Sequence, residues 1–220
     1  MKVGKAFRPH TLVVMGDFAD FYTVSAHSKD PRRAGQLPEE VASVHAGLDD
    51  LDALGAKEKI YLGGNHEDRL RRYLQDKAPE LFDVVDIPRL FRLGERAWRY
   101  VPYQSDTRLG KLYLTHDVGN AGRYSTYKAL DTYQHSVVTG HAHRLSYVVE
   151  GNTAGEFKVS AQFGWLGDLK HIDYLQAVNA RKNWALGFGI GYLDPTNKLV
   201  YLTPIPIVHY TCVVEGRLFR

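Results

Sequence analysis

The stretch Leu62-Gly63-Gly64-Asn65-His66-Glu67 decides how the rest of the chain is interpreted. It follows the predicted strand Lys59–Leu62 and leads through two glycines into polar side chains. Glycine permits a sharp turn of the backbone, so a strand, a tight turn and the start of a helix are expected in that order. Open α/β folds place their ligands at such strand ends. We therefore expect a functional site here.

The same arrangement, an apolar strand followed by a small residue and then Asp, Asn or His, recurs elsewhere in the chain. The other strands are predicted over Thr11–Met15, Lys111–Thr115 and Ser136–Thr139, and the motifs after them are Gly16-Asp17-Phe18-Ala19-Asp20, Thr115-His116-Asp117 and Gly140-His141-Ala142-His143. We expect these strand ends to converge on one edge of a sheet.

Helices alternate with strands in the first part of the chain, whereas strands follow strands later. Apolar residues repeat at helical spacing from Leu37 to Leu54, and further helices are predicted after His66 and over 121–133. Later strands are predicted over 146–150, 156–163, 186–193 and 199–202. This mixture indicates the α/β class, as a layered α/β/β/α sandwich with two mixed β-sheets, in a single domain over residues 1–220.

Composition places the chain among ordinary globular proteins. Hydrophobic residues make up 44% and charged residues 24%, the net charge is +3, and the one cysteine, Cys212, excludes an internal disulfide. No apolar run approaches the ~20 residues of a membrane span, and the basic start lacks a signal-peptide pattern. We expect a soluble cytoplasmic protein with no membrane partner.

The polar motifs together offer carboxylate, amide and imidazole ligands. Such a set suits Mn, with Fe, Zn, Ni or Co as alternatives, rather than Ca or Mg. The missing thiolates argue against a closed structural zinc site. A site rich in oxygen and nitrogen with an uncommitted histidine is suited to metal-assisted hydrolysis.

The order and spacing of four motifs resemble those of the calcineurin-like metallophosphoesterase superfamily. The motifs are Gly16-Asp17-x-x-Asp20, Gly64-Asn65-His66-Glu67, His116 and Gly140-His141-x-His143. The resemblance covers Thr11 to His143. The sequence after His143 is similar in character to that of family members from phage and bacterial genomes. It implies a hydrolase that cleaves phosphomonoesters or phosphodiesters with a metal-bound hydroxide.

The resemblance also implies roles for the metal ligands. Asp17 would bridge two metals. Asn65, His116 and His141 would complete one metal site, and His143 would bind the other metal. One or two divalent ions per chain are therefore expected.

It implies further that His66 is the general acid or stabilises charge on the phosphoryl oxygens, and that Asp20 orients it. An imidazole kept cationic by a carboxylate is a suitable proton donor to a leaving alkoxide.

The family's earlier Asp-x-His element, which supplies two ligands to the metal of His143, is missing from this sequence. The chain could start late, or the protein could hold a single metal. Alternatively, His27, Asp30 or a second subunit of a homo-oligomer could replace the lost ligands. A non-catalytic or weakly active relative that binds metal or nucleic acid is therefore the alternative to an enzyme.

Substrate clues are less specific. Arg123, Arg69 and Arg144 closely follow site motifs, and arginine forks match phosphate oxygens; the alternative for Arg69 is an ordinary solvated helix charge. Asp20 is followed by Phe21-Tyr22, which argues against the protein Ser/Thr phosphatase branch with its Asp-Arg-Gly. Mild basicity and several aromatic residues are compatible with a nuclease or a nucleotide phosphodiesterase, although aromatic residues are more often core.

Overall fold

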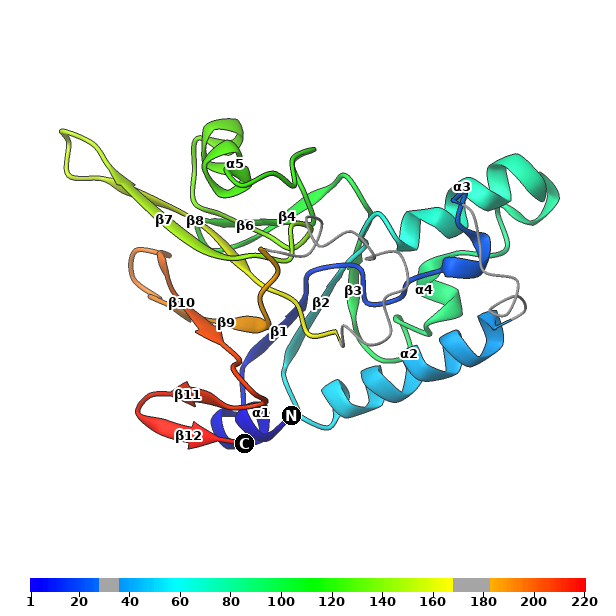
Figure 1. Cartoon of the computed structure of the whole chain (residues 1–220), viewed down its shortest axis with the longest axis horizontal. Helices are drawn as coiled ribbons and strands as arrows, with labels where there is room; N and C mark the ends of the chain where they lie inside the picture. Colours follow the sequence, from blue (N-terminus) through cyan, green and yellow to red (C-terminus); the bar gives the residue numbers. More distant parts are fainter. Residues whose placement is uncertain (28–35, 168–182) are drawn as a thin grey trace. The chain divides into compact units, whose positions relative to one another are not determined.

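The computed structural model describes residues 1–27, 36–167 and 183–220. These residues form two compact units, Met1–Ser105 and Asp106–Arg220, and each is described by itself (Figure 1). The first unit contains a three-stranded sheet and the second a five-stranded sheet. The predicted α/β class with two sheets is therefore confirmed, and the single domain over residues 1–220 stays a prediction.

The first unit is built on a parallel sheet of order β1-β2-β3. Its elements are α1 (Lys2–Phe7), β1 (Thr11–Val14), η1 (Tyr22–Val24), α2 (Leu37–Asp52), β2 (Glu58–Leu62), α3 (Glu67–Lys77), η3 (Pro79–Leu81), α4 (Ile87–Leu90) and β3 (Arg99–Val101). The predicted mixed pairing does not occur in this sheet, because the crossover through α2 makes β1 and β2 parallel. The carboxyl ends of β1 and β2 therefore lie at the same edge.

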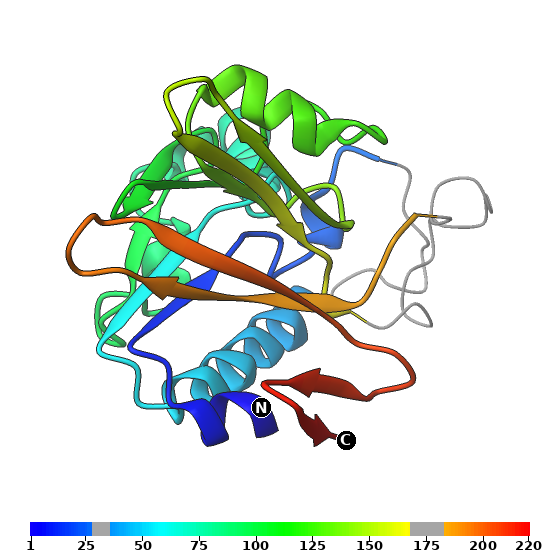
Figure 2. The same ribbon diagram turned by 90° about the vertical axis from the view of Figure 1, so that its left-hand side faces the viewer.

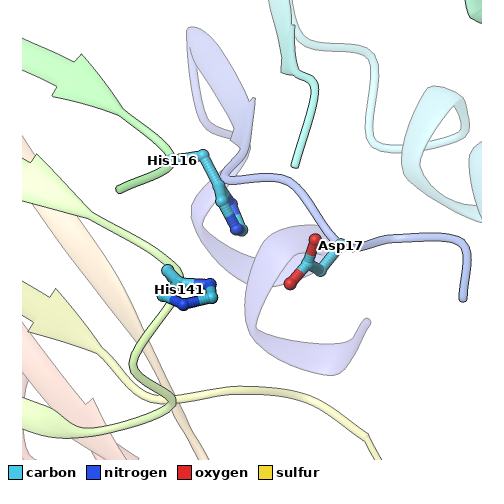
Figure 3. Close-up of side chains that lie close together, drawn as sticks. All are labelled: Asp17, His116 and His141. Carbon is cyan, nitrogen blue, oxygen red and sulfur yellow. The ribbon is translucent and has the colours of Figure 1, made fainter. Parts of the chain in front are cut away.

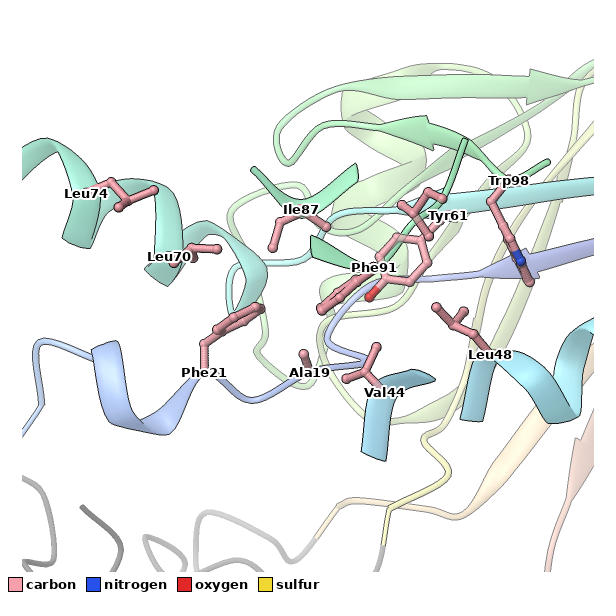
Figure 4. Packing of buried hydrophobic residues seen from close by; sticks show 11 residues of the cluster. Ala19, Phe21, Val44, Leu48, Tyr61, Leu70, Leu74, Ile87, Phe91 and Trp98 are labelled. Carbon is pink, nitrogen blue, oxygen red and sulfur yellow. The ribbon is translucent and has the colours of Figure 1, made fainter. Parts of the chain in front are cut away.

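A hydrophobic cluster supports that edge (Figure 4). Tyr61 of β2 is fully buried at its centre, with its ring 6.0 Å from Phe91 and 6.4 Å from Trp98 between centroids. Helix α2 contributes Val44 and Leu48 at i, i+4 spacing, and α3 contributes Leu70 and Leu74 in the same way. Burial of these side chains fixes β2 and the start of α3, from which the site residues project.

The second unit is built on a mixed sheet of order β4-β5-β6-β8-β7. Its elements are β4 (Asp106–Leu109), β5 (Leu112–Thr115), α5 (Ser125–Tyr133), β6 (Val137–Thr139), β7 (Leu145–Gly151), β8 (Phe157–Phe163), β9 (Gly187–Leu193), β10 (Val200–Pro206), β11 (Cys212–Val214) and β12 (Arg217–Phe219). Strands β5, β6 and β8 are parallel, whereas the hairpins β7–β8 and β9–β10 are antiparallel (Figure 2).

Several elements differ from the sequence expectations. Helix α1 and strands β4, β11 and β12 were not predicted. Strand β10 continues through Pro204 because it pairs on one side with β9, where a missing N–H can face away from the ladder. Helix α5 begins at Ser125 rather than at Ala121, since the Asn120 side chain holds Gly122 N–H in a turn at 2.9 Å. Among the described residues, no helix combines the length and the apolar character needed to cross a membrane.

Candidate functional site

Asp17 lies on the loop after β1, in the first unit (Figure 3). Its backbone has a left-handed conformation, with φ of 55°, and its Oδ1 accepts a hydrogen bond from the backbone N–H of His66 at 3.0 Å. A Cβ on Gly64 would lie 2.1 Å from that same Oδ1. Only glycine therefore lets the loop after β2 approach the Asp17 carboxylate this closely.

Asn65 occupies the turn after β2, directly beside this contact. Its backbone carbonyl accepts a hydrogen bond from Arg72 Nη2 at 3.3 Å. The ends of β1 and β2 thus bring Asp17 close to the segment Gly64–His66. These two motifs share one sheet edge, as predicted. The expectation that all four strand ends converge on one edge of a single sheet is wrong, because β5 and β6 belong to the five-stranded sheet.

His66 contacts two charged side chains. Its Nδ1 lies 3.0 Å from Asp20 Oδ1, and its Nε2 lies 3.0 Å from Arg69 Nη2. Arg69 also donates to the carboxylate and to the backbone carbonyl of Asp20, both at 2.7 Å. Burial alone would raise the pKa of Asp20, but the hydrogen bond from His66 and the charges of His66 and Arg69 outweigh burial and hold this pKa below its usual value.

These contacts indicate one proton arrangement on the His66 ring. A guanidinium can only donate, so when the His66 ring is neutral its Nε2 is the acceptor of the contact with Arg69. The ring proton then resides on Nδ1 and points to Asp20. Donation of a proton from Nε2 would require this nitrogen to gain a proton and Arg69 to move away from it.

Glu67 has the most connected carboxylate of this loop system, and its residue is 1% exposed. Its oxygens accept hydrogen bonds from the backbone N–H groups of Asp17, Phe18, Ala19 and Gly64 and from the hydroxyl of Tyr61. Burial and the neighbouring Glu67 charge raise the pKa of Tyr61 well above its usual value, so its hydroxyl remains a donor. Glu67 therefore joins the loop after β1 to the start of α3.

His116 and His141 form a pair in the second unit (Figure 3). They follow the neighbouring parallel strands β5 and β6, and their ring centroids are 5.3 Å apart at an interplanar angle of 67°. The backbone N–H groups of Gly140 and His141 both donate to the His116 carbonyl, at 2.8 and 3.0 Å. His116 is 2% exposed. The two imidazoles are thus held side by side by the sheet itself.

His143 has an aromatic environment. Its ring stacks on Trp165 with centroids 5.6 Å apart, and it meets Trp184 edge-on at 4.3 Å. The two tryptophan rings also contact each other, at 5.2 Å. His143 itself has a left-handed backbone, with φ of 54°. These contacts were not predicted, and the role of His143 as a metal ligand stays a prediction.

The candidates Arg123, Arg144 and His27 lie outside the helices and strands. Arg123 is exposed in the turn before α5, and Arg144 is half-buried, with Nη2 3.5 Å from the Ala121 carbonyl. His27 is exposed, whereas Asp30 lies outside the described residues. Arg69 differs from the other arginines because its guanidinium already binds Asp20 and His66.

Sequence reasoning assigned no role to Glu67 and gave Arg69 a different one. An acid in the first turn of a helix is common, so Glu67 carried no distinctive local signal. Its place directly after the Gly-Gly-Asn-His turn was the one available clue.

Asp17, His116 and His141 each offer one ligand atom of a type that divalent metals bind. Comparison of the chain with protein-family models, with curated proteins and with solved structures finds no match. The site is therefore interpreted from its own residues and from the sequence motifs.

Proposed function

We propose that this chain is a metal-dependent phosphoesterase in which Asp17, Asn65, His116 and His141 bind a divalent cation, with Mn as the first candidate. The observation that carries the proposal is the arrangement of Asp17, Asp20 and His66 at the ends of β1 and β2. In this arrangement the Asp17 carboxylate, which would bind the metal, lies near an imidazole that contacts a second carboxylate. The paired imidazoles of His116 and His141 support it from the second unit.

The donor types fit such a cation. One carboxylate, one amide and two imidazoles are the mixture that Mn, Fe, Zn or Co accepts. When bound, such an ion polarises a phosphoryl oxygen and lowers the pKa of a bound water. The chain's own groups then supply orientation and proton transfer.

His66 would act on the leaving-group oxygen through Nε2. Asp20 fixes the ring by accepting from Nδ1, and it stabilises the imidazolium once Nε2 carries a proton. Arg69 contacts both residues, so it would hold the pair in place. Its guanidinium would also attract the negative charge of an incoming phosphate. Arg123, exposed before α5, and Arg144 remain candidates for binding the substrate's phosphate.

The experiment is a metal and turnover measurement on matched variants. After Mn loading, metal per chain is determined by elemental analysis, and hydrolysis of bis-p-nitrophenyl phosphate is followed. We expect Asn65→Ala and His141→Ala to lose metal, and His66→Ala to retain metal but lose turnover by about 100-fold or more. His209→Asn, at an exposed histidine in a turn, is the control and should change neither quantity. Equal turnover in the wild type and His66→Ala would refute the assignment of the acid.

A non-catalytic metal- or nucleic-acid-binding protein is the second candidate. It is favoured by the aromatic packing of His143 against Trp165 and Trp184, because these contacts give the ring a structural role. One metal per chain without turnover would support this second function.

A further inference from the structure

The loop after β1 has the geometry of an anion-binding site that is filled by the protein itself. The backbone N–H groups of Asp17, Phe18 and Ala19 all point at the carboxylate of Glu67, at 2.9, 2.8 and 3.2 Å. Successive N–H groups that converge in this way form a concavity for anions. Glu67 is also the first residue of α3, where the helix dipole favours negative charge.

The carboxylate is shared between two segments. One oxygen of Glu67 accepts from Asp17 N–H and from Gly64 N–H, at 2.9 and 2.8 Å. The other accepts from Phe18, Ala19 and the Tyr61 hydroxyl. Every one of these partners is a donor, so the position requires an acceptor at both oxygens.

We propose that Glu67 is a positioning residue that holds the loop Asp17–Ala19 in its binding conformation before any metal arrives. This inference rests on the proposed function, because it gives Glu67 the task of preorganising the Asp17 ligand. Asp17 has a left-handed backbone that a non-glycine residue adopts rarely. The hydrogen bonds to Glu67 stabilise that backbone and aim the Asp17 carboxylate toward Gly64 and His66.

Glu67→Gln is the sharpest probe of the idea. It keeps the size and shape of the side chain, but it turns one acceptor oxygen into an NH₂ donor. In either orientation that NH₂ would face at least two donors of the loop system. The variant should therefore release the loop although it removes no volume from the core.

Two readouts separate positioning from general stability. Amide hydrogen exchange in the metal-free protein is measured at Asp17, Phe18 and Ala19, and Mn²⁺ affinity is measured by calorimetry. In Glu67→Gln we expect exchange to accelerate by about 10-fold or more at these amides. We also expect Mn²⁺ affinity to fall by roughly 10- to 100-fold, as for other residues that orient metal ligands.

Asp52→Asn is the matched control. Asp52 lies in the same unit and binds Lys59, Arg96 and Trp98, none of which belongs to the loop Asp17–Ala19. It should lower the melting temperature while it leaves the loop amides and Mn²⁺ affinity unchanged. An equal loss of affinity in this control would overturn the proposal.

The wild type alone supplies a test that does not depend on folding of a variant. Fast exchange of the Asp17–Ala19 amides in the metal-free wild type would overturn the proposal, as would unchanged protection and affinity in Glu67→Gln. Failure of the wild type to bind Mn²⁺ would instead refute the proposed function. The exchange rates would still decide whether Glu67 holds the loop.

Discussion

Gly64→Ala should disable the site through one added methyl group. The new Cβ would lie 2.1 Å from Asp17 Oδ1 and 2.5 Å from Asp17 N, whereas real Cβ contacts below 3.0 Å essentially do not occur. The Asp17 segment must therefore shift by roughly 1 Å, and a backbone nitrogen cannot rotate away as a flexible side chain can. Overpacking of this kind costs about 1–3 kcal/mol, and we expect the upper end. The melting temperature of the first unit should fall by roughly 10–20 °C.

The same shift should affect function more than stability. A displacement of 1 Å in a catalytic group can cost about 100-fold in rate, so turnover should drop by that factor and Mn²⁺ affinity should weaken. Calorimetry provides both the melting temperature and the affinity. Gly94→Ala is the control, because nothing lies within 4 Å of its added Cβ. If Gly64→Ala melts and binds Mn²⁺ like Gly94→Ala, the close approach inferred for the Asp17 carboxylate is refuted.

Two further predictions concern stability. Burial alone would raise the pKa of Asp52, but hydrogen bonds from Lys59, Arg96 and Trp98 outweigh burial and lower this pKa. These bonds therefore stabilise the fold at pH values above the unfolded pKa of about 3.9. The stabilisation is lost as the pH falls through the lower pKa of the folded state. Asp52→Asn should melt below the wild type at pH 7, and thermal melts at decreasing pH should show the gap closing below about pH 4; a gap that persists at pH 2 would contradict this origin. In the second unit, Gln162→Ala should cost about 1–3 kcal/mol in urea unfolding, because the buried Ser125 hydroxyl loses its partner at 2.9 Å; an unchanged midpoint would show that the bond contributes nothing.

Local patterns explain what the sequence predicted well. Helix α2 could be located because apolar residues at helical spacing are followed by Gly55, and β2 because a short apolar run is followed by two glycines. The contact between Asp20 and His66 was expected from the resemblance to the metallophosphoesterase motifs, and the two side chains do lie 3.0 Å apart. These features depend on neighbours in the chain or on parallel strand ends.

The features that escaped prediction depend on distant partners. Strand β4 has a largely polar sequence, so no apolar run identifies it as a strand. It forms because its backbone pairs with β5. Arg69 had the pattern of a solvated helix charge or of a phosphate ligand, yet its guanidinium binds Asp20, 49 positions away in the chain. His143 could not be connected to Trp165 and Trp184 by any periodicity, because His143 lies between β6 and β7 whereas both tryptophans lie between β8 and β9. Such contacts are decided by packing.

The contacts of His66 also affect whether its ring can bind a metal ion. Both of its ring nitrogens are engaged, one with a carboxylate and one with a guanidinium. A metal ion would have to displace one of these charged groups and would meet the positive charge of Arg69 at Nε2. Within its own loop, these contacts therefore oppose coordination of a metal ion by the His66 ring. Under the proposed function, these contacts assign His66 to proton transfer, whereas His116 and His141 are the imidazoles that would bind the metal.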